Sequence, residues 1–275
     1  MTNRAIITFS EKCKLACGFC YSPFNYKVPT YQVMGDILSF CSDNDISVIT
    51  FAGGDPFQYG FFRASLVKAK EKGFVVHVDT NGLDILPEDY SIIHSHVDIL
   101  GLPIDGDAST HNRMRRAGHY EIVVNCIDQL IQQGTRVKVN TLVTAINERA
   151  VEHVQAILIK KNISIWSIYQ FMPLGNARNR NERYGMSHDH FKQIVSKLDP
   201  KELPFRLEIG GQYKRQSDYL FIQTDGSLLT HDPESPSDYL PIGNIYSNDW
   251  RSQYGRNNKA MLPELCKDRY SPMNS

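Results

Sequence analysis

Three cysteines near the amino terminus carry the clearest chemical signal in this sequence. They form the pattern Cys13-x-x-x-Cys17-x-x-Cys20, whereas Cys41, Cys126 and Cys266 stand alone. Thiolates on one short loop can converge on a metal centre, and soft sulfur ligands select iron–sulfur clusters, zinc or Cu(I). Closed sites usually need four ligands. A four-iron cluster held by these three cysteines would leave one iron open to a small molecule.

Two other interpretations of the cysteines remain open at this point. A zinc site completed by a histidine also uses three cysteines, although Cys-x-x-Cys is the more usual zinc spacing. Alternatively, the thiols could be buried without a ligand, which is an unusual use of three cysteines in so short a segment. Disulfides are not expected, because the apolar run in Met1–Ser10 is too short for a secretory signal.

Composition narrows the class of protein. The 275 residues include 41% hydrophobic residues, enough for a substantial core, and Lys plus Arg equals Asp plus Glu at 30 each. A neutral chain is not the expected profile of a general nucleic-acid or membrane-surface protein, which is normally basic. No window approaches the roughly 20 apolar residues of a membrane span. We therefore expect a cytoplasmic protein with no membrane or nucleic-acid partner.

The elements that must position the cysteines alternate between strand-like and helix-like segments. Apolar, β-branched runs predict strands at Ala5–Phe9, Ser47–Phe51, Phe74–Thr80, Val97–Ile104, Val137–Thr144 and Ile163–Phe171. Helical periodicity predicts helices at about 31–43, 60–72, 87–94, 119–134, 148–161 and 188–198. Such a series predicts an α/β fold with a parallel sheet and outer helices. Six units are too few for the closed eight-stranded barrel and suit a partial, open (βα)6 barrel.

Unusual loops follow several of these strands. The cysteine loop (residues 13–20) follows the first strand, Gly53–Pro56 the second, Asn81-Gly82 the third and Asp105-Gly106 the fourth. In parallel α/β architectures the carboxyl ends of the strands form the ligand-binding face. The four loops are therefore expected to meet on one rim.

Taken in order, these motifs resemble the radical S-adenosylmethionine (SAM) superfamily. The signature C-x3-C-x-aromatic-C is matched with Phe19 as the aromatic residue, and the GGEP turn is matched by Gly53-Gly54-Asp55-Pro56, with Asp in place of Glu. Further matches are Thr80-Asn81-Gly82, the stretch from Asp105 to Arg115, Asn140 in the fifth strand, and Met172 to Gly175 after the sixth. Pro103 departs from the family, which usually has Ser there, so one side-chain contact to SAM is expected to be lost.

The resemblance implies a role for each matched residue. Cys13, Cys17 and Cys20 would hold one [4Fe–4S] cluster, whose open iron binds the amino and carboxylate groups of SAM. Phe19 and Met172 would lie by the adenine, and Arg115 would face the SAM carboxylate, with exposed surface charge as its alternative. The full set of cofactor-binding residues implied in this way is Phe19, Gly53, Gly54, Asp55, Pro56, Thr80, Asn81, Asp105, Arg115, Asn140 and Met172.

The chemistry implied by the resemblance is reductive cleavage of SAM to a 5′-deoxyadenosyl radical, which abstracts hydrogen from a substrate. The stretch from Asp105 to Arg115 resembles the branch of the superfamily whose members often carry SPASM domains, and this favours a peptide or small natural product as substrate. A viperin-like nucleotide dehydratase is the alternative enzyme, and a zinc-stabilised, non-enzymatic binding module the alternative outside catalysis. An electron donor such as flavodoxin or ferredoxin is the expected partner. The arginines of segment 172–186 could clamp an anionic substrate or simply be solvated.

The carboxyl-terminal part changes character, and a boundary is expected near residue 200. Residues 1–200 would form the partial barrel, and 201–275 a short extension resembling a SPASM domain. Tyr219–Thr224 and Ser227–Thr230, joined by Asp225-Gly226, predict a β-hairpin, and a last helix is expected from Asp249. His231 stands where such domains usually have cysteine, and is expected at the surface. An auxiliary cluster is not expected there.

Overall fold

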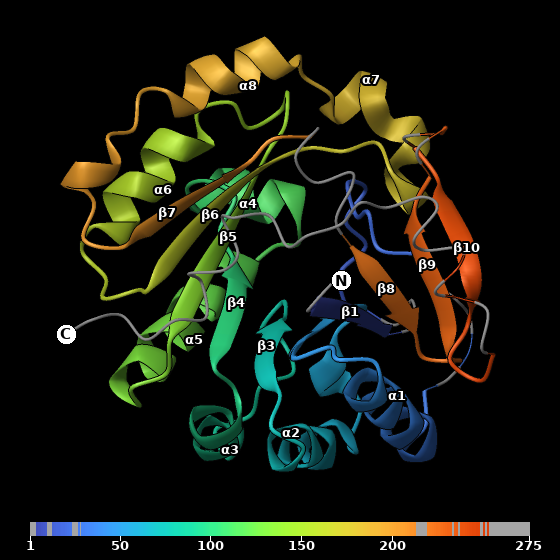
Figure 1. The fold of residues 1–275 in the computed structure, drawn as a ribbon. Helices are drawn as coiled ribbons and strands as arrows, with labels where there is room; N and C mark the ends of the chain where they lie inside the picture. Colours follow the sequence, from blue (N-terminus) through green and yellow to red (C-terminus); the bar gives the residue numbers. More distant parts are fainter. Residues whose placement is uncertain are drawn as a thin grey trace.

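The strands of this protein form a single curved sheet with helices on its outer side (Figure 1). The computed structural model describes residues 4–9, 13–23, 27, 29–212, 219–232, 234–235, 237–247, 250 and 252. The strand order is β10-β9-β8-β1-β2-β3-β4-β5-β6-β7. From β8 through β7 every neighbouring pair is parallel, so the carboxyl ends of these strands share one rim.

The parallel part is built from strand–helix units. Its strands are β1 (Arg4–Phe9), β2 (Val48–Gly53), β3 (Val75–Asp79), β4 (Ile99–Pro103), β5 (Val137–Val143), β6 (Ile165–Gln170) and β7 (Arg206–Gly210). The helices are α1 (Tyr31–Asp43), α2 (Phe62–Glu71), α3 (Asp89–His96), α4 (Ala108–Met114), α5 (His119–Gln132), α6 (Ala150–Leu158), α7 (Asn181–Tyr184) and α8 (His188–Val195), with 3-10 turns η1 (Pro56–Gln58), η2 (Gly175–Arg180) and η3 (Pro200–Glu202).

The six predicted strands and six predicted helices are all present, with ends that differ by at most three residues. The α/β barrel expectation is therefore confirmed, but the sheet is larger than six strands. β7 adds a further parallel strand beside β6, and β8 (Leu220–Gln223) pairs with the opposite edge at β1. Helix α4 was not predicted; the Asp107 side chain begins it by accepting a hydrogen bond from the Thr110 amide.

Burial on both faces explains why these strands read as continuous apolar runs. All six residues of β1 are buried, and so are all five of β4. The apolar faces of helices such as α1 and α5 cover the outside of the sheet. Charged residues inside this arc are therefore unusual, and Arg4 and Lys138 are two of them.

The predicted β-hairpin is present in the carboxyl-terminal part. β8 and β9 (Ser227–His231) are antiparallel, and β10 (Tyr239–Asn244) pairs with β9. Gly226 has φ +85° in the connecting turn, a backbone conformation that glycine adopts readily. In the described residues, the region beyond 200 thus extends both edges of the same sheet. The helix expected from Asp249 lies outside the described residues, apart from residues 250 and 252.

His231 is not at the surface, which makes that expectation wrong. Its exposed fraction is 5%, and its ring stacks on Tyr239 with 5.7 Å between centroids. The rings of Tyr219 and Phe221 pack against its edges. His231 is therefore part of an aromatic cluster on β8–β10.

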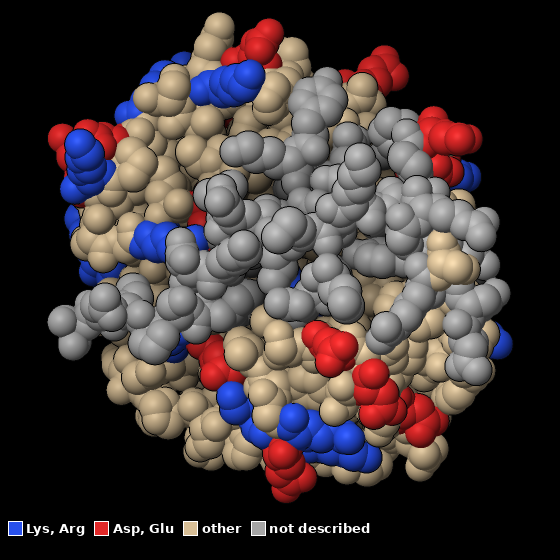
Figure 2. Space-filling model, in the orientation of Figure 1, with Lys and Arg blue, Asp and Glu red and all other residues tan. Residues whose placement is uncertain are grey.

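The exterior is mixed in charge. On the face shown in Figure 2, Lys and Arg side chains lie interspersed with Asp and Glu around the described surface. None of the described helices combines the length and apolar character that a membrane crossing requires.

Gly53 provides a test of the fold at the end of β2. It has φ +75°, and an added Cβ would lie 2.8 Å from Thr8 Cα on β1. Gly53→Ala is expected to lower the free energy of unfolding by about 1–3 kcal/mol, since both the backbone conformation and the neighbouring strand oppose a side chain. Urea unfolding measures the change.

Gly60 is the matched control for that substitution. It lies in the same connection, and an added Cβ meets no atom within 4 Å. Gly60→Ala is expected to change the free energy of unfolding by less than about 0.5 kcal/mol. Equal effects of the two substitutions would contradict the described geometry.

Candidate active site

A cavity of about 530 Å³ opens inside the arc of the sheet. Its upper part is lined by the cysteine loop and by residues at the carboxyl ends of β2, β3 and β4, and its deeper part by side chains from within the strands. We call the second set the cavity floor: Arg4, Thr50, Asp79, Lys138 and Tyr169. Three of the four loops predicted to meet on one rim supply Cys13, Gly53 and Asn81 to this cavity, whereas Asp105-Gly106 does not line it and Pro103, at the end of β4, does.

Cys13, Cys17 and Cys20 all line the cavity and are half-buried. A turn in which the Cys20 amide donates to the Cys17 carbonyl oxygen at 3.1 Å brings the last two cysteines together. Among the described residues, no three His, Cys, Asp or Glu side chains are grouped to hold a single metal ion. Three thiols facing one cavity fit a four-iron cluster, in which each thiolate binds a different iron.

Burial raises the pKa of the Cys13 thiol, and it raises the pKa of Cys17 to about 11. The Arg115 guanidinium acts in the opposite direction on Cys17. Ligation requires thiolates, so cluster binding must release the protons that burial retains. The positive charge of Arg115 favours the thiolate form of Cys17, which is the form that binds iron.

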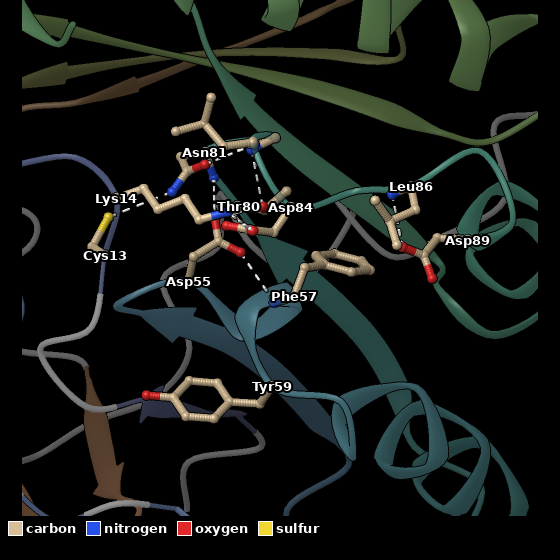
Figure 3. Close-up of polar contacts among 12 residues, drawn as sticks. Cys13, Lys14, Asp55, Phe57, Tyr59, Thr80, Asn81, Asp84, Leu86 and Asp89 are labelled. Atoms are coloured by element: carbon tan, nitrogen blue, oxygen red, sulfur yellow. Dashed lines mark hydrogen bonds and ion pairs between the residues drawn. The ribbon is translucent and has the colours of Figure 1, made fainter.

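Only the first half of the turn after β2 faces the cavity. Gly53 and Gly54 line it, whereas Asp55 and Pro56 do not. Asp55 is fully buried, and its carboxylate accepts hydrogen bonds from the Phe57 amide (3.0 Å), the Thr80 hydroxyl (2.8 Å) and the Asn81 amide (2.7 Å) (Figure 3). The Asp55 and Pro56 side chains therefore do not face the cavity, and cofactor contact by the backbone of Gly53–Pro56 stays a prediction. Asp55 instead fastens the turn after β3 to the turn after β2.

Thr80 and Asn81 both line the cavity, as expected. The Thr80 hydroxyl donates to Asp55 and also accepts from the Gly82 amide at 3.0 Å. The Asn81 side-chain nitrogen lies 3.4 Å from Cys13 Sγ and donates to it. This segment therefore contacts the cysteine loop directly.

Arg115 lies at the end of α4 and lines the cavity, so it is not simple surface charge. Its Nε donates to Asp105 Oδ2 at 2.5 Å, and its guanidinium lies over the Phe19 ring, 5.3 Å from the centroid. Asp105 is fully buried and does not line the cavity. Its other oxygen accepts from the Leu142 amide at 2.9 Å. Cofactor contact by Asp105 therefore stays a prediction, and what the structure shows is that its carboxylate positions Arg115.

Phe19, Met172 and Asn140 line the cavity as expected. Phe19 packs edge-on against Tyr184 at 5.8 Å between centroids, which fixes its ring plane. Asn140 donates to Asp79 Oδ1 at 2.8 Å, while its own Oδ1 is buried without a hydrogen-bond partner among the described residues. That oxygen is an acceptor available to a ligand.

The cavity floor was missed by sequence reasoning. Lys138 is 1% exposed and lies with Nζ 3.6 Å from Asp79 Oδ1. Arg4 donates from Nε to the Thr50 hydroxyl at 2.9 Å, and its guanidinium lies 5.7 Å from the Tyr219 ring centroid. A charged residue inside an otherwise apolar strand was the available signal for both cations.

Asp79 is held as a carboxylate by its neighbours. Burial alone would raise its pKa, but Lys138 and His77 outweigh that effect and hold the pKa well below the usual value. Among the described charged residues that line the cavity, three are cations (Arg4, Arg115, Lys138) and one is an anion (Asp79). The cavity therefore favours anionic ligands.

The arginines of segment 172–186 lie elsewhere. Asn176 is the member of η2 that lines the cavity. Arg178 is 60% exposed and lies 3.4 Å from Asp238, and Arg183 lies over the Tyr184 ring. The structure therefore favours the solvated interpretation of this segment over the substrate clamp.

Comparison with known proteins agrees with this geometry. The family model described as "Radical SAM superfamily" matches residues 7–158, more than half of the chain. The chain belongs to the radical SAM superfamily. A [4Fe–4S] cluster and SAM are accordingly its cofactors, and the zinc-stabilised, non-enzymatic alternative is wrong.

Two curated relatives are named S-adenosylmethionine-dependent nucleotide dehydratase. The protein from Thermoplasmatales archaeon (strain ISO4-H5) is 30% identical over 138 residues, which cover 48% of this chain and 49% of the relative. That from Flammeovirga pacifica is 25% identical over 202 residues, covering 68% of this chain and 69% of the relative. The first alignment thus spans about half of that relative's length.

Solved structures share the fold. The radical SAM protein anSMEcpe with bound AdoMet superposes with a TM-score of 0.75 at 16% identity, covering 96% of this chain and 85% of that one. The same protein is also solved with AdoMet and the Kp18Cys peptide (TM-score 0.73, 16% identity, covering 93% and 81%). At this identity the likeness establishes the architecture alone.

Arg115 and its neighbour Arg116 allow a matched test of the rim. Arg115→Ala is expected to weaken SAM binding by roughly 1–3 kcal/mol, because a charge-assisted contact to the carboxylate is lost. Arg116→Ala, at an exposed position, should leave the affinity unchanged. Calorimetry on the reconstituted proteins measures both, and equal affinities would contradict the role of Arg115.

Acid is expected to destabilise this protein through three buried histidines. Burial lowers the pKa of His77 and of His111 to about 3 and that of His119 to about 4, whereas an unfolded histidine titrates near 6.5. Between these values the unfolded chain binds more protons, so the free energy of unfolding falls as the pH drops from about 6.5 towards 4. Burial raises the pKa of Asp55 to about 6, so this one carboxyl group acts in the opposite direction to the three histidines.

Urea unfolding of the reconstituted protein between pH 7.5 and 5 measures the slope. His77→Gln should make the dependence on pH shallower, because one of the three groups is removed. His153→Gln, at an exposed position, is the control and should keep the original slope. A wild-type stability that rises on acidification would refute the assignment.

Proposed function

We propose that this radical SAM enzyme acts on a nucleotide and catalyses its dehydration. The observation that carries the proposal is the pair of buried cations on the cavity floor, Arg4 and Lys138. They lie in the same cavity as the three cysteines but come from the interior of the sheet. An anionic substrate bound there would extend from the floor towards the cofactor at the rim.

Nucleotide phosphates match the chemistry of this floor. Arg4 offers a guanidinium, which suits bidentate contact with phosphate oxygens, and Lys138 offers a compact ammonium. Asp79 neutralises part of this charge and holds Lys138 in place through their 3.6 Å contact. Asp105 likewise offsets Arg115, so three cations stand against two carboxylates and the cavity keeps a positive balance that suits a phosphate ester.

The comparison with relatives supports a nucleotide over a peptide. Both relatives described above are named as nucleotide dehydratases. The peptide-bound neighbour supports the alternative through fold likeness alone. A peptide or small natural product was the first expectation from sequence motifs, and the buried cations together with these relatives move the proposal to the nucleotide class.

The roles of this chain's residues follow from the division of the cavity. When bound, the reduced cluster and SAM supply a 5′-deoxyadenosyl radical that abstracts hydrogen from the substrate. Arg115 would orient the SAM carboxylate, and Phe19 and Met172 would pack against the adenine. Arg4 and Lys138 would anchor the phosphates, while the Asn140 oxygen would accept from a hydroxyl or amino group.

Two further parts of the proposal concern the rest of the chain. An electron donor such as flavodoxin or ferredoxin would reduce the cluster. The region 201–275 would act as an extension of the barrel without an auxiliary cluster. In support, β8 pairs with β1, Tyr219 lines the cavity beside Arg4, and residues 201–275 contain one cysteine, Cys266.

The test is substrate-dependent cleavage of SAM. Reconstituted, dithionite-reduced enzyme is incubated with a panel of ribonucleoside triphosphates or with short peptides, and 5′-deoxyadenosine is quantified. A nucleotide is expected to raise the yield and to give a product lighter by one water in mass spectrometry. Cys17→Ala, which lacks a cluster ligand, should give neither product. Stimulation by peptides and by no nucleotide would overturn the proposal.

The same assay tests the cavity floor. Lys138→Met keeps an apolar stem against Tyr169 but removes the charge, and is expected to raise KM for the nucleotide about ten-fold, equal to about 1.4 kcal/mol. SAM affinity should be unchanged. Lys160→Met, on the exposed end of the α6 segment, is the matched control. An unchanged KM in Lys138→Met would remove this residue from the substrate site.

A further inference from the structure

A continuous chain of hydrogen bonds connects the cysteine loop with Arg115. It runs from Cys13 to Asn81, then through His119 and His111 to the backbone of Asp105. The Asp105 carboxylate then pairs with Arg115. None of these hydrogen bonds depends on which substrate the enzyme takes.

Asn81 is held in one orientation by its surroundings (Figure 3). Its Oδ1 accepts from the Leu83 amide at 2.8 Å, so its side-chain nitrogen must be the atom that faces Cys13 Sγ at 3.4 Å. Its backbone amide donates to Asp55 at 2.7 Å, and its carbonyl oxygen accepts from His119 Nε2 at 2.8 Å. The amide donor is therefore aimed at the sulfur by contacts on every other polar group of the residue.

The two histidines have defined tautomers. The Asp105 amide donates to His111 Nδ1 at 3.1 Å, which leaves the proton of that ring on Nε2. His111 Nε2 can then donate to His119 Nδ1 at 2.8 Å, and His119 Nε2 donates onward to Asn81. Both rings are fully buried, and their planes are 13° apart with 4.9 Å between centroids, so they meet edge to edge as this hydrogen bond requires. A proton added to either acceptor nitrogen would break the chain, which agrees with the low pKa values that burial causes.

A donor to a cluster sulfur has a specific electrostatic effect. Reduction adds negative charge to the cluster and its thiolates, and a hydrogen bond to a ligand sulfur stabilises that charge. Such a contact raises the reduction potential, and its loss lowers it. In the described part of the structure, the side chain of Asn81 donates such a hydrogen bond to the sulfur of Cys13.

We propose that Asn81 raises the reduction potential of the cluster by its N–H···S hydrogen bond to Cys13, and that His119 and His111 are positioning residues that hold Asn81 for this contact. The inference concerns the cluster common to the superfamily and stands independently of the nucleotide proposal. Its consequence is that the rim loops and α5 together determine how readily the enzyme accepts its electron.

The experiment is a redox titration of the reconstituted enzyme without substrate, followed by electron paramagnetic resonance. Asn81→Leu removes the donor without adding charge, and its potential is expected to be more negative than that of the wild type. Asn81→Asp keeps the oxygen that accepts from Leu83 and also lacks the donor, so it should shift in the same direction. Iron and sulfide content is measured for each variant to establish that the cluster is intact.

His119→Phe tests the positioning role. It should shift the potential in the same direction as Asn81→Leu, and the double variant should shift no further than Asn81→Leu alone. His96→Phe, whose ring contacts the carbonyl oxygen of Ile92 within α3, is the matched control and should keep the wild-type potential.

Each outcome decides one part of the proposal. A wild-type potential in Asn81→Leu or Asn81→Asp with full iron content overturns the tuning role. Additive shifts in the double variant overturn the positioning role of His119. Loss of iron in Asn81→Leu, Asn81→Asp and His119→Phe alike would overturn both, since the contact would then serve cluster assembly.

Discussion

The Asp55 carboxylate is the interaction on which the geometry of the rim depends. It is fully buried, and it binds groups from two loops that follow neighbouring strands. Burying a carboxylate is costly unless hydrogen bonds satisfy it, and three donors do so here. Because the Asn81 amide is one of them, the position of Asn81 is tied to the end of β2. The contact between Asn81 and Cys13 then ties the cysteine loop to both.

A second buried carboxylate serves the opposite side of the rim in the same way. Asp105 accepts from Arg115 and from the backbone of β5. In both cases the acidic residue of the motif points away from the cavity and fixes a neighbour that faces it. The two carboxylates thus orient hydrogen-bond donors that face the cavity, while their own negative charge stays outside it.

The cavity therefore has two electrostatic regions. The rim combines three thiols with Arg115, and the floor combines Arg4 and Lys138 with Asp79. The rim and the floor are separated along the interior of the sheet. One small molecule could therefore reach the cofactor at the rim while its charged group is bound at the floor, away from the reacting atoms. Remote binding energy of this kind can position the reacting carbon, which is the principal task of a protein that works through a cofactor radical.

Much of this architecture could be predicted from the sequence, because the signals are local. The spacing of Cys13, Cys17 and Cys20 indicated a metal centre, the further motifs in order identified it as a four-iron cluster, and alternating apolar and helical patterns predicted the parallel sheet. Loops such as Gly53–Pro56 follow strands, and parallel strands bring their ends to one edge. The rim and most of its residues followed from these facts alone.

Only the tertiary structure decided which way the side chains point and which distant residues meet. Asp55 and Asp105 lie within motifs that predict ligand contacts, yet neither lines the cavity: Asp55 accepts hydrogen bonds from the turn after β3, and Asp105 accepts one from the backbone of β5. Arg4 and Lys138 come together because β1 and β5 curve around the same interior. The relay through His111 and His119 likewise depends on how α4 and α5 pack against the turn after β3. Side-chain direction and long-range contact are properties of packing, which no local pattern encodes.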